Sequence, residues 1–154
     1  MNIEDKIAMW NKERGLVVWD INLEMKLILE EAKEYYDAET LVDKFDAFLD
    51  LGFVAHGSAF KYTHNSVNNK EFEEFISLLG IIRKDFQSLI NIYHEDFRDL
   101  ANSGLEIVLK YNNKKSSEKN EFGKIIKPKD FVGPEKELQE LLDSYMNKGE
   151  NKND

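Results

Sequence analysis

Two acidic residues of one predicted helix lie where core-facing side chains are expected. The helix is predicted over residues 23–38, because apolar residues recur there every three or four positions. Projected at about 100° per residue, Glu31 falls between Leu27 and Tyr35. Glu34 lies on the same side of the helix, three positions later. Because a buried carboxylate without a partner destabilises a fold strongly, both acids require compensation.

A second predicted helix, over residues 40–62, carries three acids in one stripe of an otherwise largely apolar surface. These acids are Asp43, Asp46 and Asp50, at positions i, i+3 and i+7. Like charges four positions apart, as in Asp46 and Asp50, destabilise a helix. Gly57 projects onto the same stripe two turns later, where the lack of a side chain leaves room for a group to approach the backbone.

The five inward-facing carboxylates predict an oxygen-rich cation site. Hard oxygen ligands suit Mg²⁺ or Mn²⁺, with substrate phosphate completing the coordination shell. The chain has no cysteine, and none of its three histidines belongs to this set, so zinc is a poor match. Lys61 ends the aspartate stripe with a positive charge. The alternative is a structural network in which lysines or arginines neutralise the acids.

The composition is that of one folded domain rather than of a nucleic-acid or membrane protein. Hydrophobic residues make up 42% of the 154 residues, which is enough to build a core. The net charge of −9 opposes binding to nucleic-acid phosphate, and no apolar run is long enough to span a bilayer. Because cysteine and a signal-peptide pattern are absent, we expect a soluble cytoplasmic protein.

Helical periodicity dominates the chain and strand alternation is weak, so we predict an all-α bundle. Asn22 and Thr40 are the expected N-caps of the two acidic helices. Pro134 suits the first turn of the last helix, and residues 148–154 are expected to form a disordered tail. Helices are expected over residues 3–14, 23–38, 40–62, 70–79, 81–101, 105–111 and 135–147.

The first acidic segment resembles a motif of the MazG-type all-α nucleoside triphosphate pyrophosphohydrolases. The sequence EEAKE at 30–34 is similar to the family's ExxE motif, with Glu31 and Glu34 at the two acidic positions. Acids three positions apart are common on any helix, so the remaining motifs of the family have to support this one.

The second acidic segment, VDKFDAFLDLGFVAHGSA at 42–59, is similar to the second acidic motif of that family. Asp50 matches the last acid of the motif. In much of the family a glutamate stands three positions earlier, where this chain has Ala47. Asp46 or Asp43 would take the place of that ligand.

The segment 111–135 is similar to the region that follows the helices in phage-type members. Asn112 and Lys115 match an Asn-x-x-Lys element. A GK(I/V)xKP stretch is matched by Gly123, Lys124, Lys127 and Pro128. The resemblance makes Lys115 and Lys124 candidates for binding phosphate.

The resemblance covers roughly residues 5–62 and 105–142. Residues 63–104 are longer than the corresponding region of compact members and resemble an inserted helical pair. The implied fold is a MazG-like helical bundle, formed as a single domain by residues 1–147. Family members assemble as dimers or tetramers, so a homodimer or homotetramer is expected.

The activity implied is Mg²⁺-dependent hydrolysis of a nucleoside triphosphate, expected to be a deoxynucleotide, to the monophosphate and pyrophosphate. The resemblance implies metal ligands at Glu31, Glu34, Asp50 and either Asp46 or Asp43. It implies contacts to phosphate or base from Lys61, Asn112, Lys115 and Lys124. Glu34 is also the candidate general base. The expected role is housecleaning of the nucleotide pool.

Two alternatives to this activity stay open. The chain can be a non-catalytic helical interaction protein that kept the fold and lost one ligand at Ala47. It can also be a related phosphohydrolase, such as a phosphoribosyl-ATP pyrophosphohydrolase or a dUTPase.

Overall fold

The computed structural model describes residues 1–115, 118–121 and 124–151, with residues 148–151 described as backbone only. The regular structure of this part is α-helical, apart from an isolated antiparallel bridge between Lys119 and Ile125, which confirms the predicted all-α class. The helices are α1 (Ile3–Glu13), α2 (Ile21–Asp37), α3 (Leu41–His64), α4 (Lys70–Ser77), α5 (Leu79–Ile90), α6 (His94–Asn112) and α7 (Glu135–Asn151).

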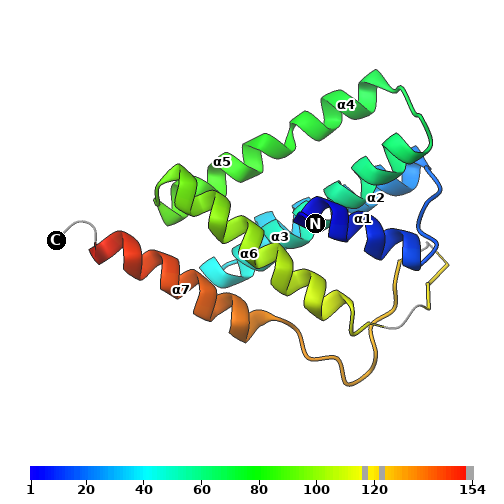
Figure 1. Cartoon of the computed structure of the whole chain (residues 1–154). Coiled ribbons are helices and arrows are strands. Elements are labelled where there is room, and N and C mark those ends of the chain that lie inside the picture. The colour runs from blue at the N-terminus through cyan, green and yellow to red at the C-terminus, as the bar shows by residue number, and fades with distance from the viewer. Residues whose placement is uncertain (116–117, 122–123, 152–154) are drawn as a thin grey trace.

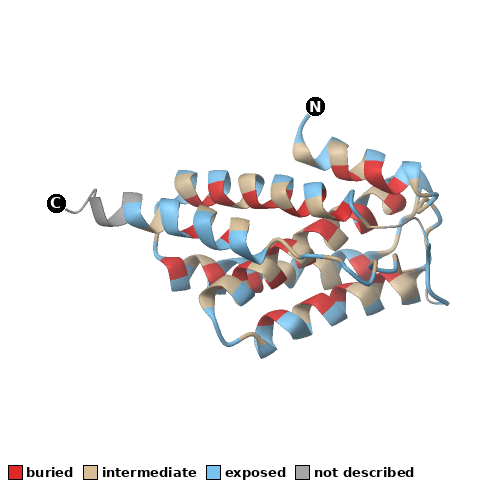
Figure 2. Ribbon diagram, turned by 90° about the horizontal axis from the view of Figure 1, so that it is seen from below, coloured by how far each residue is buried: buried red, intermediate tan, exposed pale blue. Residues whose placement is uncertain are grey.

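Helix α3 occupies the centre of the molecule and packs against α1, α2, α5, α6 and α7 (Figure 1). Because neighbours surround it, buried residues occur all around its circumference. They include Phe45, Ala47, Leu49, Leu51 and Phe53. On the other helices, buried residues form stripes on the inward faces, and exposed residues cover the outward faces (Figure 2). Acids on α3 can therefore lie close to the core, as the half-buried Asp46 and Asp50 do, whereas Asp43 in the first turn is exposed.

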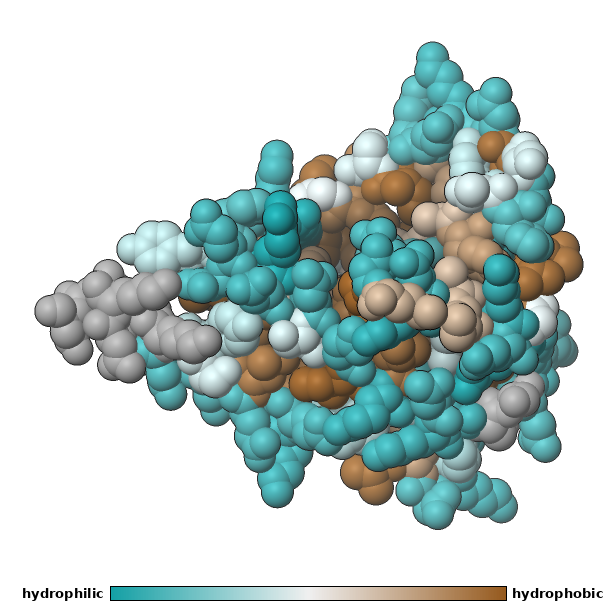
Figure 3. All heavy atoms as spheres, viewed as in Figure 1, coloured by the Kyte–Doolittle hydropathy of each residue, from teal (hydrophilic) through white to brown (hydrophobic). Residues whose placement is uncertain are grey.

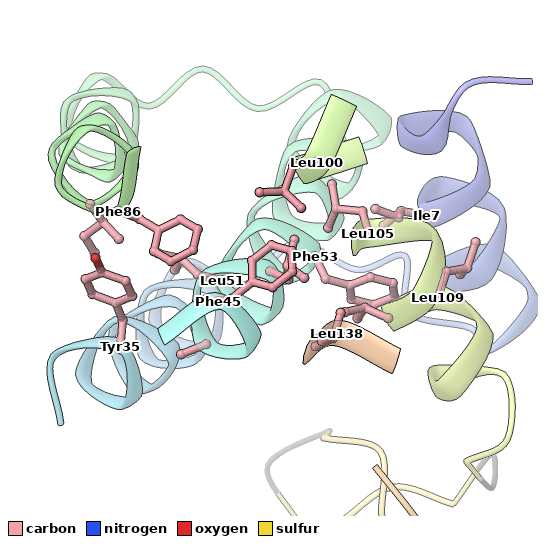
Figure 4. Packing of buried hydrophobic residues seen from close by; sticks show 14 of the residues in the cluster. Ile7, Tyr35, Phe45, Leu51, Phe53, Phe86, Leu100, Leu105, Leu109 and Leu138 are labelled. Carbon is pink, nitrogen blue, oxygen red and sulfur yellow. The ribbon is translucent and has the colours of Figure 1, made fainter. Parts of the chain in front are cut away.

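Aromatic side chains join α3 to the helices on one side of it. Phe45 stacks on Phe86 of α5, with ring centroids 5.6 Å apart and the planes within 4° of parallel. The hydroxyl of Tyr35 on α2 donates a hydrogen bond to Asp85 Oδ2 at 2.6 Å. Figure 4 shows the labelled side chains of α1, α2, α3, α5, α6 and α7 pointing into this shared core. The packing fixes α2 against α3, and these two helices carry the acidic residues.

The start of α2 differs from the prediction. Thr40 caps α3 as expected, accepting a hydrogen bond from the Asp43 amide. The prediction of Asn22 as the N-cap of α2 is wrong, because Asp20 accepts from the amides of Asn22 and Leu23 at 3.0 and 3.3 Å. Since α2 begins at Ile21, Glu24 lies in its first turn, and Glu24 is fully buried.

The single helix predicted over 81–101 is also wrong, because the chain turns at Asn91. This residue has φ 49°, the left-handed conformation that asparagine tolerates better than most residues, and it ends α5. Phe86 and Phe97 are buried on either side of the turn, so the apolar spacing gives no sign of it. Helix α6 then runs without a break through the separate helix predicted over 105–111.

The remaining helix ends lie within a few residues of their predicted positions. Helix α7 continues to Asn151, four residues beyond the predicted end, and residues 152–154 lie outside the described residues. The predicted insertion, 63–104, covers the end of α3, all of α4 and α5, and the first half of α6. Helices α4 and α5 run along one edge of the molecule (Figure 1). The face shown in Figure 3 is largely hydrophilic, consistent with a chain in which 33% of residues are charged.

A glycine in α6 allows its close contact with α3. A Cβ atom on Gly104 would lie 2.6 Å from Leu49 Cδ1 and 3.0 Å from Phe45 Cζ, and both neighbours are buried. We expect Gly104→Ala to lower the free energy of unfolding by about 1–3 kcal/mol through overpacking. Urea unfolding measures this change. The matched control is Gly80→Ala in α5, where a Cβ meets nothing within 4 Å and alanine favours the helix. Equal stability of the two variants would contradict the expected overpacking.

Candidate metal centre

Three carboxylates from α2 and α3 come together at the surface between these helices. Glu31, Glu34 and Asp50 each place one oxygen atom within 4.8 Å of the others. Glu31 is 7% exposed because it continues the buried face of α2 that includes Ile28 and Tyr35. Asp50 is half-buried and Glu34 is exposed. The group therefore extends from the interior to solvent.

The environment of these acids opposes their ionisation. Burial raises the pKa of Glu31 to about 7, with repulsion from Glu34 contributing next and Lys124 acting in the opposite direction. Burial also raises the pKa of Asp50 well above its ordinary value, with further contributions from Asp46 and Glu31. Because ionising Glu31 and Asp50 together is unfavourable, an added cation close to both would be bound favourably.

The donor set fits a hard divalent cation. Carboxylate oxygens are the ligands that Mg²⁺ and Mn²⁺ prefer in proteins. Glu31 Oε2 is buried and accepts no hydrogen bond from the described part of the chain. An unpaired buried carboxylate oxygen is costly, and coordination to a metal ion would remove that cost. The three acids therefore satisfy the chemical requirements of a magnesium or manganese site.

Lysines from the segment after α6 lie beside the acids. Lys115, Lys124 and Lys127 line the same cavity as Glu31. Lys124 Nζ lies 3.5 Å from Glu30 Oε2 and 3.9 Å from Glu31 Oε1. Burial lowers the pKa of Lys115, although Asp50 opposes this effect. Cationic side chains next to a metal-binding group are suited to hold phosphate oxygens.

The cavity has a charged end and an apolar end. Its volume is about 170 Å³, and the charged end is lined by the three acids and by Lys115, Lys124 and Lys127. Buried or half-buried apolar side chains from α1, α2, α3 and two connecting segments line the other part. They are Trp10, Leu16, Leu23, Leu27, Phe53, Val54 and Ile125. A ligand that combines a phosphate chain with a ring would match this distribution.

The structure does not bring all five predicted acids together. Asp46 lies outside the group of three and lines a neighbouring cavity with Lys127 and Glu135. Burial raises the pKa of Asp46 to about 6, and Glu135 contributes next. Asp43 is exposed and also lies outside the group. Asp46 contributes to the raised pKa of Asp50, so it is the better of the two candidates to replace the family acid at Ala47.

Lys61 and Gly57, which the sequence analysis places near the acids, each contact another residue of the protein. Lys61 is 6% exposed and forms an ion pair with Glu24 at 2.8 Å, although it also lines the cavity. The space beside Gly57 is taken by Asn11, whose Nδ2 would lie 3.2 Å from an added Cβ. Gly57 nevertheless lines the cavity, so the expectation that this glycine lies beside space for a ligand is confirmed in part.

Some of the residues predicted from the motifs in segment 111–135 lie at the cavity. Asn112 is buried and lines the cavity with Lys115 and Lys124. Gly123 lies outside the described residues. Glu24 and Trp10 also line the cavity, and neither is among the site residues predicted from the sequence. Glu24 is seven positions before Glu31, hence on the same helix face, and this spacing was the available signal.

None of the described helices combines the length and the apolar character needed to cross a bilayer. No match was found when the chain was compared with protein-family models, with curated proteins and with solved structures.

Proposed function

We propose that this protein hydrolyses nucleoside triphosphates to the monophosphate and pyrophosphate with the help of Mg²⁺. The observation that carries the proposal is the group of Glu31, Glu34 and Asp50 in one cavity with Lys115, Lys124 and Lys127. Metal-binding acids next to cationic side chains suit a phosphate chain better than a neutral substrate. The sequence resemblance to MazG-type enzymes, which involves the same residues, also supports the proposal, and we include a bundle of that type in it.

The residues of the site divide into three roles. Glu31 and Asp50 would hold the ion from the buried side, with Glu34 completing the set from the exposed side. When bound, Mg²⁺ supplies neutralisation of phosphate charge and a lower pKa for the attacking water. Glu34 is the acid best placed to accept a proton from that water, because it faces solvent.

The phosphate chain would lie along the lysines. Lys115 is half-buried and lines the cavity with Asp50, so it could hold an oxygen of the phosphate nearest the metal. Lys127 lines both cavities that meet at Asp50, so it can follow the pyrophosphate as that group leaves. Lys124 would exchange its contacts with Glu30 and Glu31 for contacts with phosphate.

One observation favours a non-catalytic protein as the second candidate. Lys124 already approaches Glu30 and Glu31, as expected if lysines neutralise the acids in a structural network. The distance to Glu31 is 3.9 Å, and Glu31 Oε2 has no partner in the described chain, so this neutralisation is incomplete. The incomplete pairing is the reason for preferring the enzyme.

The test is pyrophosphate release from a panel of ribo- and deoxynucleoside triphosphates, with Mg²⁺ and with EDTA. We expect pyrophosphate with Mg²⁺ and none with EDTA. Orthophosphate as the first product would mean that a different bond is cut. No turnover across the panel, from a folded sample, would favour the non-catalytic candidate. Light scattering of the same sample tests the expected homodimer or homotetramer.

A further inference from the structure

We infer that the apolar end of the cavity binds a nucleobase through an exocyclic amino group and the ring nitrogen beside it. The inference rests on the proposed function, since it assigns the base of the same nucleotide to the part of the cavity beyond the carboxylates. The aliphatic side chains of Leu23, Leu27 and Val54 and the ring of Phe53 provide apolar walls for a planar ring. Two buried polar atoms among these walls have no partner in the described protein.

The first of these atoms is a carboxylate oxygen of Glu24. This side chain is fully buried, and its Oε1 accepts hydrogen bonds from Ser58 Oγ at 3.0 Å and Lys61 Nζ at 2.8 Å. Oε2 is equally buried and accepts none from the described residues. Leaving a buried acceptor unsatisfied is costly, so this oxygen is suited to a ligand N–H group.

The second atom is the indole nitrogen of Trp10. The side chain is 7% exposed, and its ring packs edge-to-face on Phe53 with centroids 5.0 Å apart. Nε1 is buried and donates to no acceptor in the described part of the chain. An indole nitrogen can only donate, so the matching ligand atom is an acceptor. Both residues line the cavity, and these two buried atoms are the acceptor and the donor that we assign to a bound base.

This polarity selects between bases that differ only in an amino or oxo group. Cytosine and adenine carry an amino donor next to a ring-nitrogen acceptor. In uracil and hypoxanthine, the amino group is replaced by a carbonyl and the ring nitrogen is protonated, so both polarities are reversed. A carbonyl facing the Glu24 carboxylate is repelled, and a ring N–H facing Trp10 meets another donor. We therefore expect the amino-bearing bases to bind more tightly.

The test measures binding of nucleotides without hydrolysis. A Trp19→Phe variant leaves Trp10 as the source of indole fluorescence, because the chain has two tryptophans. In EDTA, this variant is titrated with deoxycytidine against deoxyuridine monophosphate, and with deoxyadenosine against deoxyinosine monophosphate. We expect saturable changes in fluorescence, with the amino-bearing member binding about 10- to 100-fold more tightly. Equal affinities within both pairs, or no binding by any of the four, would overturn the inference.

Two variants of the otherwise unchanged chain, followed by calorimetry, locate the preference. Trp10→Phe removes the N–H group and keeps a ring against Phe53, so the preference should fall without loss of the fold. Glu24→Gln can offer either an amide N–H or a carbonyl, so the preference should fall to less than about threefold. If Glu24→Gln fails to fold because Lys61 loses its partner, Trp10→Phe decides alone. An unchanged preference in Trp10→Phe overturns the assignment.

The outcomes separate this inference from the proposed function. Preferential binding without pyrophosphate release in Mg²⁺ would keep the base-binding assignment and remove the hydrolase proposal. Pyrophosphate release without preference between amino and oxo bases would do the reverse.

Discussion

Asp50→Asn is expected to reduce Mg²⁺-dependent pyrophosphate release at least about 100-fold. Loss of a residue that only supports a metal ligand costs about 10- to 100-fold, and loss of a direct ligand should cost at least as much. The substitution keeps the shape of the side chain but removes the only charge that α3 contributes to the group of three acids. Because Asp50 is half-buried beside Glu31, loss of its charge also relieves repulsion, so the fold should be retained. Steady-state rates at saturating Mg²⁺, together with circular dichroism, measure both effects.

Two further substitutions sharpen this prediction. Asp37→Asn on α2 is the matched control, because Asp37 is exposed and pairs with Lys33 at 2.7 Å outside the group. It should leave the rate unchanged. Asp43→Asn distinguishes the candidate ligand predicted from the sequence from the group of acids seen in the structure. Asp43 shares the stripe of Asp50 but is exposed, so this variant should keep its activity. Loss of activity in Asp43→Asn together with full activity in Asp50→Asn would sink the assignment of the site.

Glu31→Gln is expected to stabilise the metal-free protein at pH 8. The folded-state pKa of Glu31 is about 7 against an ordinary value of 4.5, so folding favours the protonated form. The folded state therefore binds more protons than the unfolded state between these two values, and stability falls as the pH rises through this window. At 1.36 kcal/mol per pKa unit, removing the charge should add about 1–3 kcal/mol at pH 8 and little near pH 4.5.

Urea unfolding of the wild type and of Glu31→Gln in EDTA, at pH 5 and pH 8, measures this difference. Mg²⁺ should reverse the order at pH 8, because it stabilises the ionised wild type and binds the variant poorly. Asp37→Asn, on the exposed face of the same helix and outside the group of three acids, is the control and should not gain stability at pH 8. A variant that is less stable than the wild type at pH 8 in EDTA would show that Glu31 is already compensated by the protein.

The acidic group could be predicted because helical projection determines which residues share a face. Glu31, Glu34 and Asp50 were identified in this way, and the structure brings them together. The same projection also included Asp43, because residues that share a helix face can still lie far apart along the helix axis. Asp43 lies seven residues before Asp50, which is about 10 Å along a helix axis, too far for both to reach one ion.

The pairing of Lys61 could not be predicted, because it depends on contacts between distant parts of the chain. Its partner, Glu24, is 37 positions away in sequence and lies on another helix. With the predicted N-cap at Asn22, Glu24 is the second residue of the helix, whereas the observed N-cap at Asp20 makes it the fourth. The segment after α6 has no periodicity, so only the family resemblance indicated that Lys115 and Lys124 would lie near the acids.

The central claim is that Glu31, Glu34 and Asp50 bind a divalent cation, and titration with Mn²⁺ followed by electron paramagnetic resonance tests it most directly. The method needs no substrate, because free and bound Mn²⁺ give different signal intensities. We expect saturable binding to the wild type and to Asp37→Asn, and binding weakened at least about tenfold in Asp50→Asn. No saturable binding by the folded wild type, or equal binding by Asp50→Asn, would contradict the account.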